Sequence, residues 1–340
     1  MTKQFDIAIL GATGVVGESI LTILAERSFP VGNIYALASA RSKGETVIFK
    51  GQSLTVLDAA EFDFRKVQIA FFSAGASISA DYAPIAAKAG CVVIDNTSQF
   101  RYDADIPLVV PEVNPEAIRF YKNRHIIANP NCSTIQLVVV LKPIYDAVGI
   151  TRINVATYQS VSGTGKAAIE TLTAQTKAIL TNQMPEVAVY PIPIAFNLIP
   201  HIDIFEENGY TREEMKMVRE TRKILGDDTI AVNPTAVRVP VYSGHSEAVH
   251  IETKTKLTKQ QAMVLLANAP GIIIKDELTD GGYPSPRFEG DGQDKVYVGR
   301  IREDISHPTG LNLWVVADNI RKGAALNSIQ IAEILVRDYL

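Results

Sequence analysis

Cys132 is the residue of this sequence best suited to covalent chemistry. It follows a short strand predicted at His125 to Asn129 and a turn at Pro130-Asn131, and it precedes a long apolar run, Ile135 to Val148, which predicts a helix. A helix dipole and unpaired backbone N–H groups stabilise a thiolate at a helix N-terminus. The same N–H groups suit an oxyanion at an attacked carbon. The alternative is that Cys132 is a small residue that packs the start of the helix.

A glycine-rich turn near the N-terminus suits a dinucleotide. The apolar run Phe5 to Leu10 predicts a buried strand, and helical periodicity follows from Glu18 to Arg27. Between them, small residues let the backbone approach a pyrophosphate at the helix N-terminus. The spacing is G-x-x-G-x-x-G, which departs from the usual G-x-G-x-x-G, so a tight turn without a ligand is the alternative. The candidate cofactor contacts are Gly11, Thr13, Gly14, Val15 and Val16.

The end of the second predicted strand favours NADP over NAD. Asn33 to Ser39 is typical of a strand, and Ala40-Arg41-Ser42-Lys43 follows it. An NAD site usually has Asp or Glu here, bonded to the ribose 2′-hydroxyl. Arg41 and Ser42 suit a 2′-phosphate instead, and the alternative is a solvated basic turn.

Strands and helices continue to alternate after this point. Strands are predicted at Val67 to Ser73 and at Cys91 to Asp95, with a helix at Asp81 to Ala89 between them. Cys91 stands among apolar neighbours and is interpreted as a core residue. The pattern predicts a Rossmann-like α/β domain, and a nucleophilic cysteine beside a nicotinamide site predicts thioester chemistry on an aldehyde.

Over nearly its whole length the chain resembles the aspartate-semialdehyde dehydrogenases, in their bacterial branch. The resemblance rests on an ordered set of motifs: Gly11-Ala12-Thr13-Gly14-Val15-Val16-Gly17, Asp95-Asn96-Thr97-Ser98-Gln99-Phe100-Arg101, Val110-Pro111-Glu112-Val113-Asn114, Asn129-Pro130-Asn131-Cys132-Ser133-Thr134, Gln159-Ser160-Val161-Ser162-Gly163-Thr164-Gly165, Arg238-Val239-Pro240-Val241, Gly244-His245-Ser246-Glu247 and Ala317-Asp318-Asn319-Ile320-Arg321-Lys322-Gly323-Ala324-Ala325.

The resemblance implies roles for residues that the pattern alone does not select. Cys132 is the implied nucleophile, His245 the acid/base and Gln159 the group that orients substrate. The implied substrate and phosphate contacts are Arg101, Asn131, Glu213, Lys216 and Arg238, and the implied cofactor contacts include Ser162, Gly163 and Asn319. Without the resemblance, these residues have structural interpretations: a strand-end cap for Gln159, a structural hydrogen bond for His245 and a solvated helix face for Lys216.

Three further points concern the histidines and the anion-binding residues. His250 lies five residues after His245 and faces the other side of a regular strand, and His125 and His201 are interpreted as structural. Glu214 competes with Glu213 for the substrate ammonium group. Gly163-Thr164-Gly165-Lys166 fails as a phosphate-binding P-loop, because Ser160 stands at its first glycine position and Ala167 at its Ser/Thr position.

The second half predicts an α+β catalytic and dimerisation domain. Strands are expected at Ile153 to Gln159, Ala231 to Asn233, Ala236 to Tyr242, Ala248 to Lys254 and Leu311 to Ala317, with helices from near Lys166 and at Arg212 to Leu225. Residues 1–129 with 319–340 are predicted to form the NADP-binding domain, and residues 130–318 the catalytic domain. The last helix, Gly323 to Leu340, is expected to pack on the nucleotide-binding domain. An open sheet in the catalytic domain predicts a homodimer.

Composition excludes several classes of partner. The net charge of −4, without long like-charge runs, argues against nucleic acid and anionic membranes. No apolar stretch approaches the ~18–20 residues of a membrane helix, and the N-terminus lacks the layout of a signal peptide. Only two cysteines occur, in different contexts, which fits a reducing cytosol, so a cytoplasmic location is predicted. No metal is expected.

The implied reaction reduces L-aspartyl 4-phosphate with NADPH to L-aspartate 4-semialdehyde and phosphate, for lysine, threonine and methionine synthesis. N-acetyl-glutamyl-phosphate reductase is the nearest rival, but Arg238 with Glu213 fits a free amino acid better. Glyceraldehyde-3-phosphate dehydrogenase shares the thioester plan, but the Ser-Cys-Thr-Thr sequence usual around its cysteine is absent from this chain. A non-catalytic dinucleotide-binding paralogue is the alternative outside enzymes, and it would not need Cys132 and His245.

Overall fold

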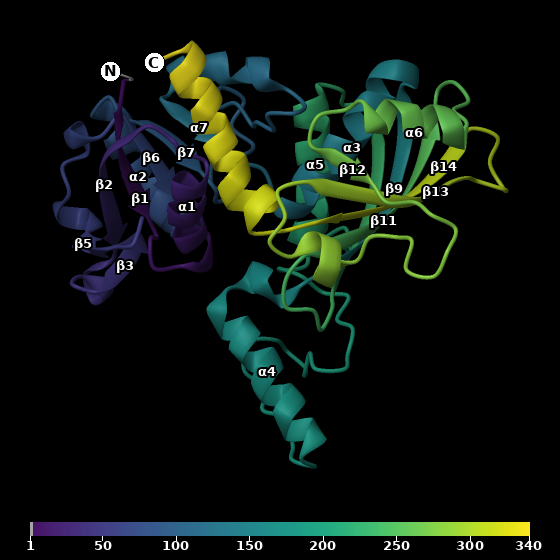
Figure 1. Cartoon of the computed structure of the whole chain (residues 1–340), viewed down its shortest axis with the longest axis horizontal. Helices are drawn as coiled ribbons and strands as arrows, with labels where there is room; N and C mark the ends of the chain where they lie inside the picture. The colour runs from purple at the N-terminus through teal and green to yellow at the C-terminus, as the bar shows by residue number, and fades with distance from the viewer. Residues whose placement is uncertain (1–2) are drawn as a thin grey trace. The chain divides into compact units, whose positions relative to one another are not determined.

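The computed structural model describes residues 3–340, which divide into two compact units (Figure 1). The first unit contains the residues up to Asn131 together with Ala324–Leu340, and the second contains Cys132–Gly323. The sequence placed the two boundaries a few residues earlier, after 129 and after 318. No helix within residues 3–340 has the length and apolar character needed to cross a membrane.

The first unit is built on a six-stranded sheet in which every pair of neighbours is parallel, in the order β5-β2-β1-β6-β7-β8. Its strands are β1 (Phe5–Leu10), β2 (Val31–Ala38), β5 (Leu57–Asp58), β6 (Ile69–Phe72), β7 (Val92–Asp95) and β8 (Ile126–Ala128), and β3 (Thr46–Phe49) and β4 (Gln52–Thr55) form a separate hairpin. The two central strands, β1 and β6, are apolar at every position except Asp6, because a parallel sheet is covered on both faces.

The helices of this unit cover both faces of the sheet. They are α1 (Val15–Glu26), α2 (Ala76–Lys88) and α7 (Leu326–Asp338). Right-handed crossovers place α1 and α2 on opposite faces, because β1 to β2 and β6 to β7 run in opposite directions across the sheet. The helix α7, drawn in yellow, packs beside α1 and shares its apolar core (Figure 1). The strand order reverses between β1 and β6, which is where such sheets bind ligands.

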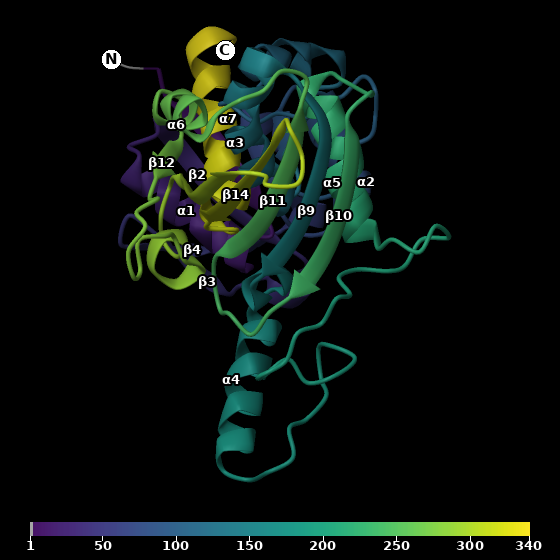
Figure 2. The same cartoon turned by 90° about the vertical axis from the view of Figure 1, so that its right-hand side faces the viewer.

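The second unit is built on a mixed six-stranded sheet in the order β10-β9-β11-β14-β13-β12. Its strands are β9 (Ile150–Gln159), β10 (Ala231–Arg238), β11 (His245–Thr253), β12 (Ile272–Ile274), β13 (Val296–Glu303) and β14 (Gly310–Ala317), and its helices are α3 (Cys132–Val148), α4 (Lys166–Leu180), α5 (Arg212–Leu225) and α6 (Lys259–Ala267). The helices α3, α5 and α6 pack on the sheet, whereas α4 extends away from it (Figure 2). The predicted fold class, a Rossmann-like domain with an α+β domain, is confirmed.

One strand assignment from the sequence was wrong. Ala231 to Asn233 and Ala236 to Tyr242 were expected as separate strands, but β10 is one strand that ends at Arg238 and contains Pro234. The proline is tolerated because β10 is an edge strand, where a missing N–H group faces no neighbour. The segment before α4 contains a short 3-10 helix, Val161–Thr164, and the last helix, expected from Gly323, begins at Leu326 after a π-helical turn, Arg321–Ala325.

Candidate active site

Cys132 is the first residue of α3, three residues before the predicted helix start, and is half-buried. The helix starts here because Pro130 and Asn131 end the preceding turn, and the first-turn N–H groups lack intrahelical partners. The backbone at Gly323 covers one side of the cysteine: a Cβ atom built on Gly323 would lie 2.8 Å from Cβ of Cys132.

Three predicted site residues form one row across neighbouring strands. Arg238 of β10 is the register partner of Gln159 of β9. The β9–β11 pair places His245 opposite Gln159, one step beyond the pair Ser246 and Tyr158. Residues directly opposite each other on paired strands point to the same face of the sheet, so all three side chains share one face, and all three are buried.

The amide of Gln159 ties this row to the start of α3. Its Nε2 atom lies 2.9 Å from Oγ of Ser133, the residue after Cys132, 3.2 Å from Oε1 of Glu213 and 3.3 Å from Oγ1 of Thr157. Since Gln159 is 2% exposed, its orientation is fixed by these partners. Gln159 therefore connects the helix that carries Cys132 to the acidic residue on α5.

The two adjacent glutamates of α5 have different tasks. Glu214 closes the capping box of the helix, where it accepts from the backbone N–H of Thr211 at 2.6 Å, and it also accepts from the N–H of Ala236 at 2.9 Å. Glu213 faces Gln159 and Lys216, and its Oε2 lies 2.9 Å from Nζ of Lys216. Glu213 is thus the glutamate that contacts the other predicted site residues, Gln159 and Lys216.

Lys216 is held between two carboxylates rather than solvated. Its Nζ lies 2.9 Å from Asp203 and 2.9 Å from Glu213. Burial lowers its pKa, but attraction to Glu213 and hydrogen bonds to Asp203 and Glu213 outweigh burial and raise the pKa above its ordinary value. Lys216 therefore remains a cation at neutral pH.

His245 is fully buried and neutral. Burial first, and then the positive charge of Arg238, lower its pKa to about 3. Its Nδ1 accepts from the backbone N–H of Ser160 at 3.1 Å, while its Nε2 has no hydrogen-bond partner among residues 3–340. Gly163 lies over the ring, because a Cβ atom there would be 3.5 Å from Nε2.

The guanidinium group of Arg238 uses one of its nitrogens in a hydrogen bond within the protein, and another has no partner among the described residues. Its Nη1 donates to the carbonyl oxygen of Ser160 at 2.7 Å. Its Nε, also buried, lacks a partner in the part of the chain that the structure describes. A guanidinium with unused donors in a buried site suits a carboxylate.

Asn319 lies in the second unit and organises the loops around His245. Its Oδ1 accepts from the backbone N–H of Gly244 at 3.0 Å, and its Nδ2 donates to Oγ of Ser162 at 3.0 Å. Asn319 is 2% exposed. Its side chain thus fixes the loop before His245 and the loop that carries Ser162 and Gly163, besides any contact with the cofactor.

The glycine turn of the first unit fits a dinucleotide. Gly11 has a φ of +93°, and a Cβ atom there would meet Ser73 at 2.9 Å, so the turn after β1 packs against the turn after β6 at the switch point. A Cβ atom on Gly17 would lie 2.2 Å from the carbonyl oxygen of Gly11, so α1 must start close to the turn. Gly14 caps α1 without a side-chain hydrogen bond, which leaves N–H groups of the first turn for a phosphate.

The remaining contacts expected in the first unit are Arg41, Ser42, Arg101 and Asn131. Arg41 is exposed and Ser42 half-exposed in the 3-10 helix Ala40–Ser42 that follows β2, a position suited to a 2′-phosphate, whereas the neighbouring Lys43 is paired with Glu61 at 2.6 Å. Arg101 is buried, and its Nη2 donates to the carbonyl oxygen of Asn96 at 2.9 Å. Asn131 is the buried residue before Cys132.

Sequence reasoning missed Ser133, Ser160 and Gly323 as parts of the site. Each lies inside a motif that carried the resemblance, but the sequence pattern around a single serine or glycine does not predict its role. Only the strand register and the approach of the 318–323 segment reveal them.

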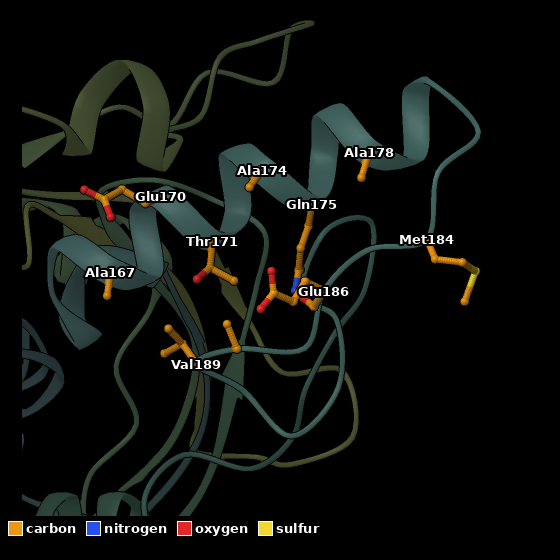
Figure 3. Close-up of a pocket in the computed structure, with 10 residues that line it drawn as sticks. Ala167, Glu170, Thr171, Ala174, Gln175, Ala178, Met184, Glu186 and Val189 are labelled. Carbon is orange, nitrogen blue, oxygen red and sulfur yellow. The ribbon is translucent and has the colours of Figure 1, made fainter.

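A hollow elsewhere on the second unit contains none of the predicted site residues. It lies between α4 and the chain that follows it, with Met184 at its outer end (Figure 3). The lining residues are Ala167, Glu170, Thr171, Ala174, Gln175, Ala178, Met184, Glu186, Ala188 and Val189. It is open to solvent and separate from the row of Arg238, Gln159 and His245.

Comparison with known proteins decides the family. Residues 6–121 match the model described as semialdehyde dehydrogenase, NAD binding domain, and residues 141–322 match semialdehyde dehydrogenase, dimerisation domain. The chain is 64% identical over 340 residues to the aspartate-semialdehyde dehydrogenase of Legionella pneumophila, covering 100% of this chain and 98% of that one. It is 60% identical to the protein of that name from Shewanella violacea, covering 100% of both.

The chain belongs to the aspartate-semialdehyde dehydrogenase family. It is an oxidoreductase with an NAD(P)-binding domain, as the sequence predicted. Among solved structures, it is similar to aspartate semialdehyde dehydrogenase II from Vibrio cholerae complexed with ASA, with a TM-score of 0.98 and 58% identity over 100% of both chains. The aspartate semialdehyde dehydrogenase from Candida albicans, solved with NADP, has a TM-score of 0.78 and 27% identity, covering 98% of this chain and 99% of that one.

Proposed function

We propose that this enzyme reduces L-aspartyl 4-phosphate to L-aspartate 4-semialdehyde and phosphate, through a thioester at Cys132. The observation that carries the proposal is the position of Cys132 at the N-terminus of α3, tied through Ser133 to the buried row of Gln159, Arg238 and His245. The semialdehyde would supply lysine, by way of diaminopimelate, and threonine and methionine synthesis.

The bound substrate is oriented by opposite charges at its amino-acid end. Arg238 offers its unused N–H groups to the α-carboxylate, and Glu213 accepts from the α-ammonium group. Gln159 lies between these two groups and Ser133, so it places the acyl carbon toward Cys132. A site built for both charges favours a free amino acid over an N-acetylated one, since an acetylated amine would leave Glu213 unpaired.

The leaving phosphate requires cations that stay charged. Lys216 remains protonated between Asp203 and Glu213. We assign it and Arg101 to the phosphate, with Asn131 beside the nucleophile. Cys132 attacks as the thiolate, which the start of α3 stabilises, and the same N–H groups hold the oxyanion. His245 is the acid/base group of the site.

The proposed cofactor is NADP(H), which supplies the hydride when bound. The contacts would be Gly11, Thr13, Gly14, Val15 and Val16 for the pyrophosphate, Arg41 and Ser42 for the 2′-phosphate, and Ser162, Gly163 and Asn319 for the nicotinamide end. Gly163 suits the last task because the absence of a side chain leaves the Nε2 edge of His245 open.

The proposed assembly is a homodimer of the second unit, in the cytoplasm. Large apolar side chains are exposed from the last residue of α4 through the segment that follows it: Leu180, Met184, Val187, Val189, Ile192, Phe196 and Leu198. This concentration exceeds the scattered exposure of a monomer surface, and it falls inside the region matched by a dimerisation-domain model, so the occupant we propose is a second copy of the chain. A reducing compartment keeps the Cys132 thiol available.

A steady-state assay tests the proposal. The enzyme should reduce NADP with L-aspartate 4-semialdehyde and phosphate, and much less with NAD or with N-acetyl-glutamate semialdehyde. Cys132→Ala should abolish phosphate-dependent NADP reduction and leave cofactor binding intact. Normal turnover of this variant, or a preference for the acetylated substrate, would refute the assignment.

A further inference from the structure

The chain that follows α4 returns toward the sheet (Figure 2) and meets it at Arg238. Ile199 and Arg238 form an isolated antiparallel bridge. The N–H of Ile199 donates to the carbonyl oxygen of Arg238 at 3.0 Å, and the N–H of Arg238 donates to the carbonyl oxygen of Ile199 at 2.8 Å. The returning chain is therefore fixed to the end of β10, at the residue proposed to bind the substrate carboxylate.

Within this returning chain, Tyr190 lies against the side chain of Arg238. The central carbon of the guanidinium lies over the ring of Tyr190, 5.9 Å from the ring centre. Arg238 is 5% exposed and Tyr190 is half-buried. The electron-rich face of an aromatic ring attracts a guanidinium, and it does so more strongly where water is excluded. The ring of Tyr190 therefore restricts where the guanidinium can lie.

The ring of Tyr190 is itself held on two sides. Its hydroxyl donates to Oγ1 of Thr164 at 3.0 Å, at the end of the short 3-10 helix before α4. Gln175 of α4 fixes the backbone nearby, because its Oε1 accepts from the N–H groups of Ile194 and Ala195 at 2.9 and 3.2 Å. The ring also packs against an apolar cluster of the second unit, which contains Val161, Ala168, Leu172, Ile194, Ala195 and Ile199.

Hydrogen bonds within the protein fix the guanidinium of Arg238 only in part. Its Nη1 donates to the carbonyl oxygen of Ser160, and its Nε has no partner among residues 3–340. A Cβ atom on Gly163 would lie 3.3 Å from Nη1, so the backbone closes that side. A carboxylate accepts two parallel N–H bonds only when the plane of the guanidinium is turned toward it. The ring of Tyr190 limits that rotation.

We propose that Tyr190 is a positioning residue of the active site, whose ring holds the guanidinium of Arg238 in the orientation that receives the substrate α-carboxylate. This rests on the proposed function of Arg238. The α-carboxylate takes no part in the bond changes, so its contacts stabilise the bound substrate and the transition state alike. Loss of the ring therefore raises KM and leaves kcat nearly unchanged.

Steady-state kinetics of two Tyr190 variants test this proposal. Tyr190→Leu keeps apolar bulk but loses the ring, and it should raise the KM for L-aspartate 4-semialdehyde about threefold or more, with kcat within about twofold of the wild type. Tyr190→Phe keeps the ring and should retain the wild-type KM. A wild-type KM in Tyr190→Leu, or a Tyr190→Phe variant as impaired as Tyr190→Leu, would overturn the proposal.

Two control variants separate the ring from its surroundings. Thr164→Val removes the hydrogen-bond partner of Tyr190 and leaves the ring in place. Leu172→Ala leaves a cavity in the apolar cluster and should lower the thermal midpoint. Both should keep the KM for the semialdehyde within about twofold of the wild type. A rise in Leu172→Ala as large as in Tyr190→Leu would show that packing of the cluster, and not the ring, supports substrate binding.

Nuclear magnetic resonance tests the contact without turnover. Full-length enzyme with isotope-labelled arginine gives a nitrogen–proton signal for the buried Nε–H group of Arg238, which is assigned by its loss in Arg238→Lys. A neighbouring aromatic ring shifts such a signal, so it should move in Tyr190→Leu and keep its position in Tyr190→Phe. A signal that is unchanged in both variants would overturn the proposal. A wild-type enzyme that does not turn over aspartate semialdehyde would instead refute the proposed function, whatever this spectrum shows.

Discussion

Cβ of Cys132 would lie 2.8 Å from a Cβ atom placed on Gly323, so the backbone at Gly323 lies directly against the Cys132 side chain. Real Cβ atoms essentially never approach each other this closely, so no side chain fits at position 323 unless Cys132 moves. The N–H of Gly323 donates to the carbonyl oxygen of Asp318 at 2.9 Å, which fixes this backbone. The position of the Cys132 side chain is therefore limited by a glycine far from it in sequence.

Gly323→Ala should lower kcat without preventing folding. The added methyl group must displace Cys132 or the start of α3, and a misplacement of about 1 Å costs on the order of 100-fold in rate. Cofactor binding and the thermal midpoint are measured in parallel: binding should change little, and the midpoint should fall moderately, because overpacking costs about 1–3 kcal/mol. A variant with wild-type kcat would show that this contact does not position the sulfur.

The two glutamates of α5 provide a matched pair of variants. Glu213→Gln should raise the KM for aspartate semialdehyde about tenfold or more, since hydrogen bonds to charged groups contribute about 1.5–3 kcal/mol. Glu214→Ala should instead lower the free energy of unfolding by about 1 kcal/mol, through loss of the capping box. Steady-state kinetics and chemical denaturation distinguish them, and an exchange of the two phenotypes would contradict the assignment of Glu213 to the site.

Glu247 predicts a pH-dependent stability. It is two residues after His245 on β11, fully buried, and burial raises its pKa well above the ordinary value, against the opposing effect of Gln136. At pH values between the pKa of Glu247 in the unfolded state and its higher pKa in the folded state, only the folded state keeps the proton. The free energy of unfolding therefore falls as the pH rises through this range.

Glu247→Gln should remove that fall, because an amide cannot ionise. The free energy of unfolding of the variant should exceed that of the wild type at neutral pH by about 1 kcal/mol or more, since one pKa unit corresponds to about 1.36 kcal/mol. The difference should vanish toward acidic pH, where Glu247 is neutral in both states. Denaturant melts over a pH series provide the measurement, and equal stability at all pH values would mean that Glu247 is not a buried neutral acid.

The exposed apolar side chains beyond α4 predict the effect of added charge on assembly. Met184→Glu combined with Phe196→Glu should convert the dimer to a monomer, because both side chains, 92% and 66% exposed, would be desolvated at the interface. Gln183→Glu, which adds a charge at an exposed polar neighbour, is the control and should remain dimeric. Light scattering measures the mass, and a double variant that stays dimeric would move the interface elsewhere.

Local pattern was sufficient to predict much of the fold. The first strand, Phe5–Leu10, and the helix Arg212–Leu225 were located to the residue, because apolar periodicity, glycine turns and capping residues act over a few neighbours. The strand break expected before Ala236 was wrong, because local reasoning cannot know that β10 is an edge strand that tolerates Pro234.

The site was predictable only in part, for a similar reason. Cys132 was predicted as the nucleophile from its place before an apolar helix, whereas Arg238, Gln159 and His245 come from three separate strands, and the register that aligns them is a tertiary property. The choice of Glu213 over Glu214 depended on which carboxylate the capping box uses. The role of Asn319 in holding Gly244 and Ser162 could not be read from its own neighbours in sequence.

Acyl transfer to one sulfur is the central claim, and peptide mass mapping tests it most directly. The enzyme is mixed with L-aspartyl 4-phosphate without NADPH, quenched in acid and digested. The predicted result is an aspartyl thioester on the peptide that contains Cys132, absent from Cys132→Ser and lost when NADPH is added before the quench. An enzyme that turns over without this adduct, or that carries it on Cys91 instead, would contradict the account.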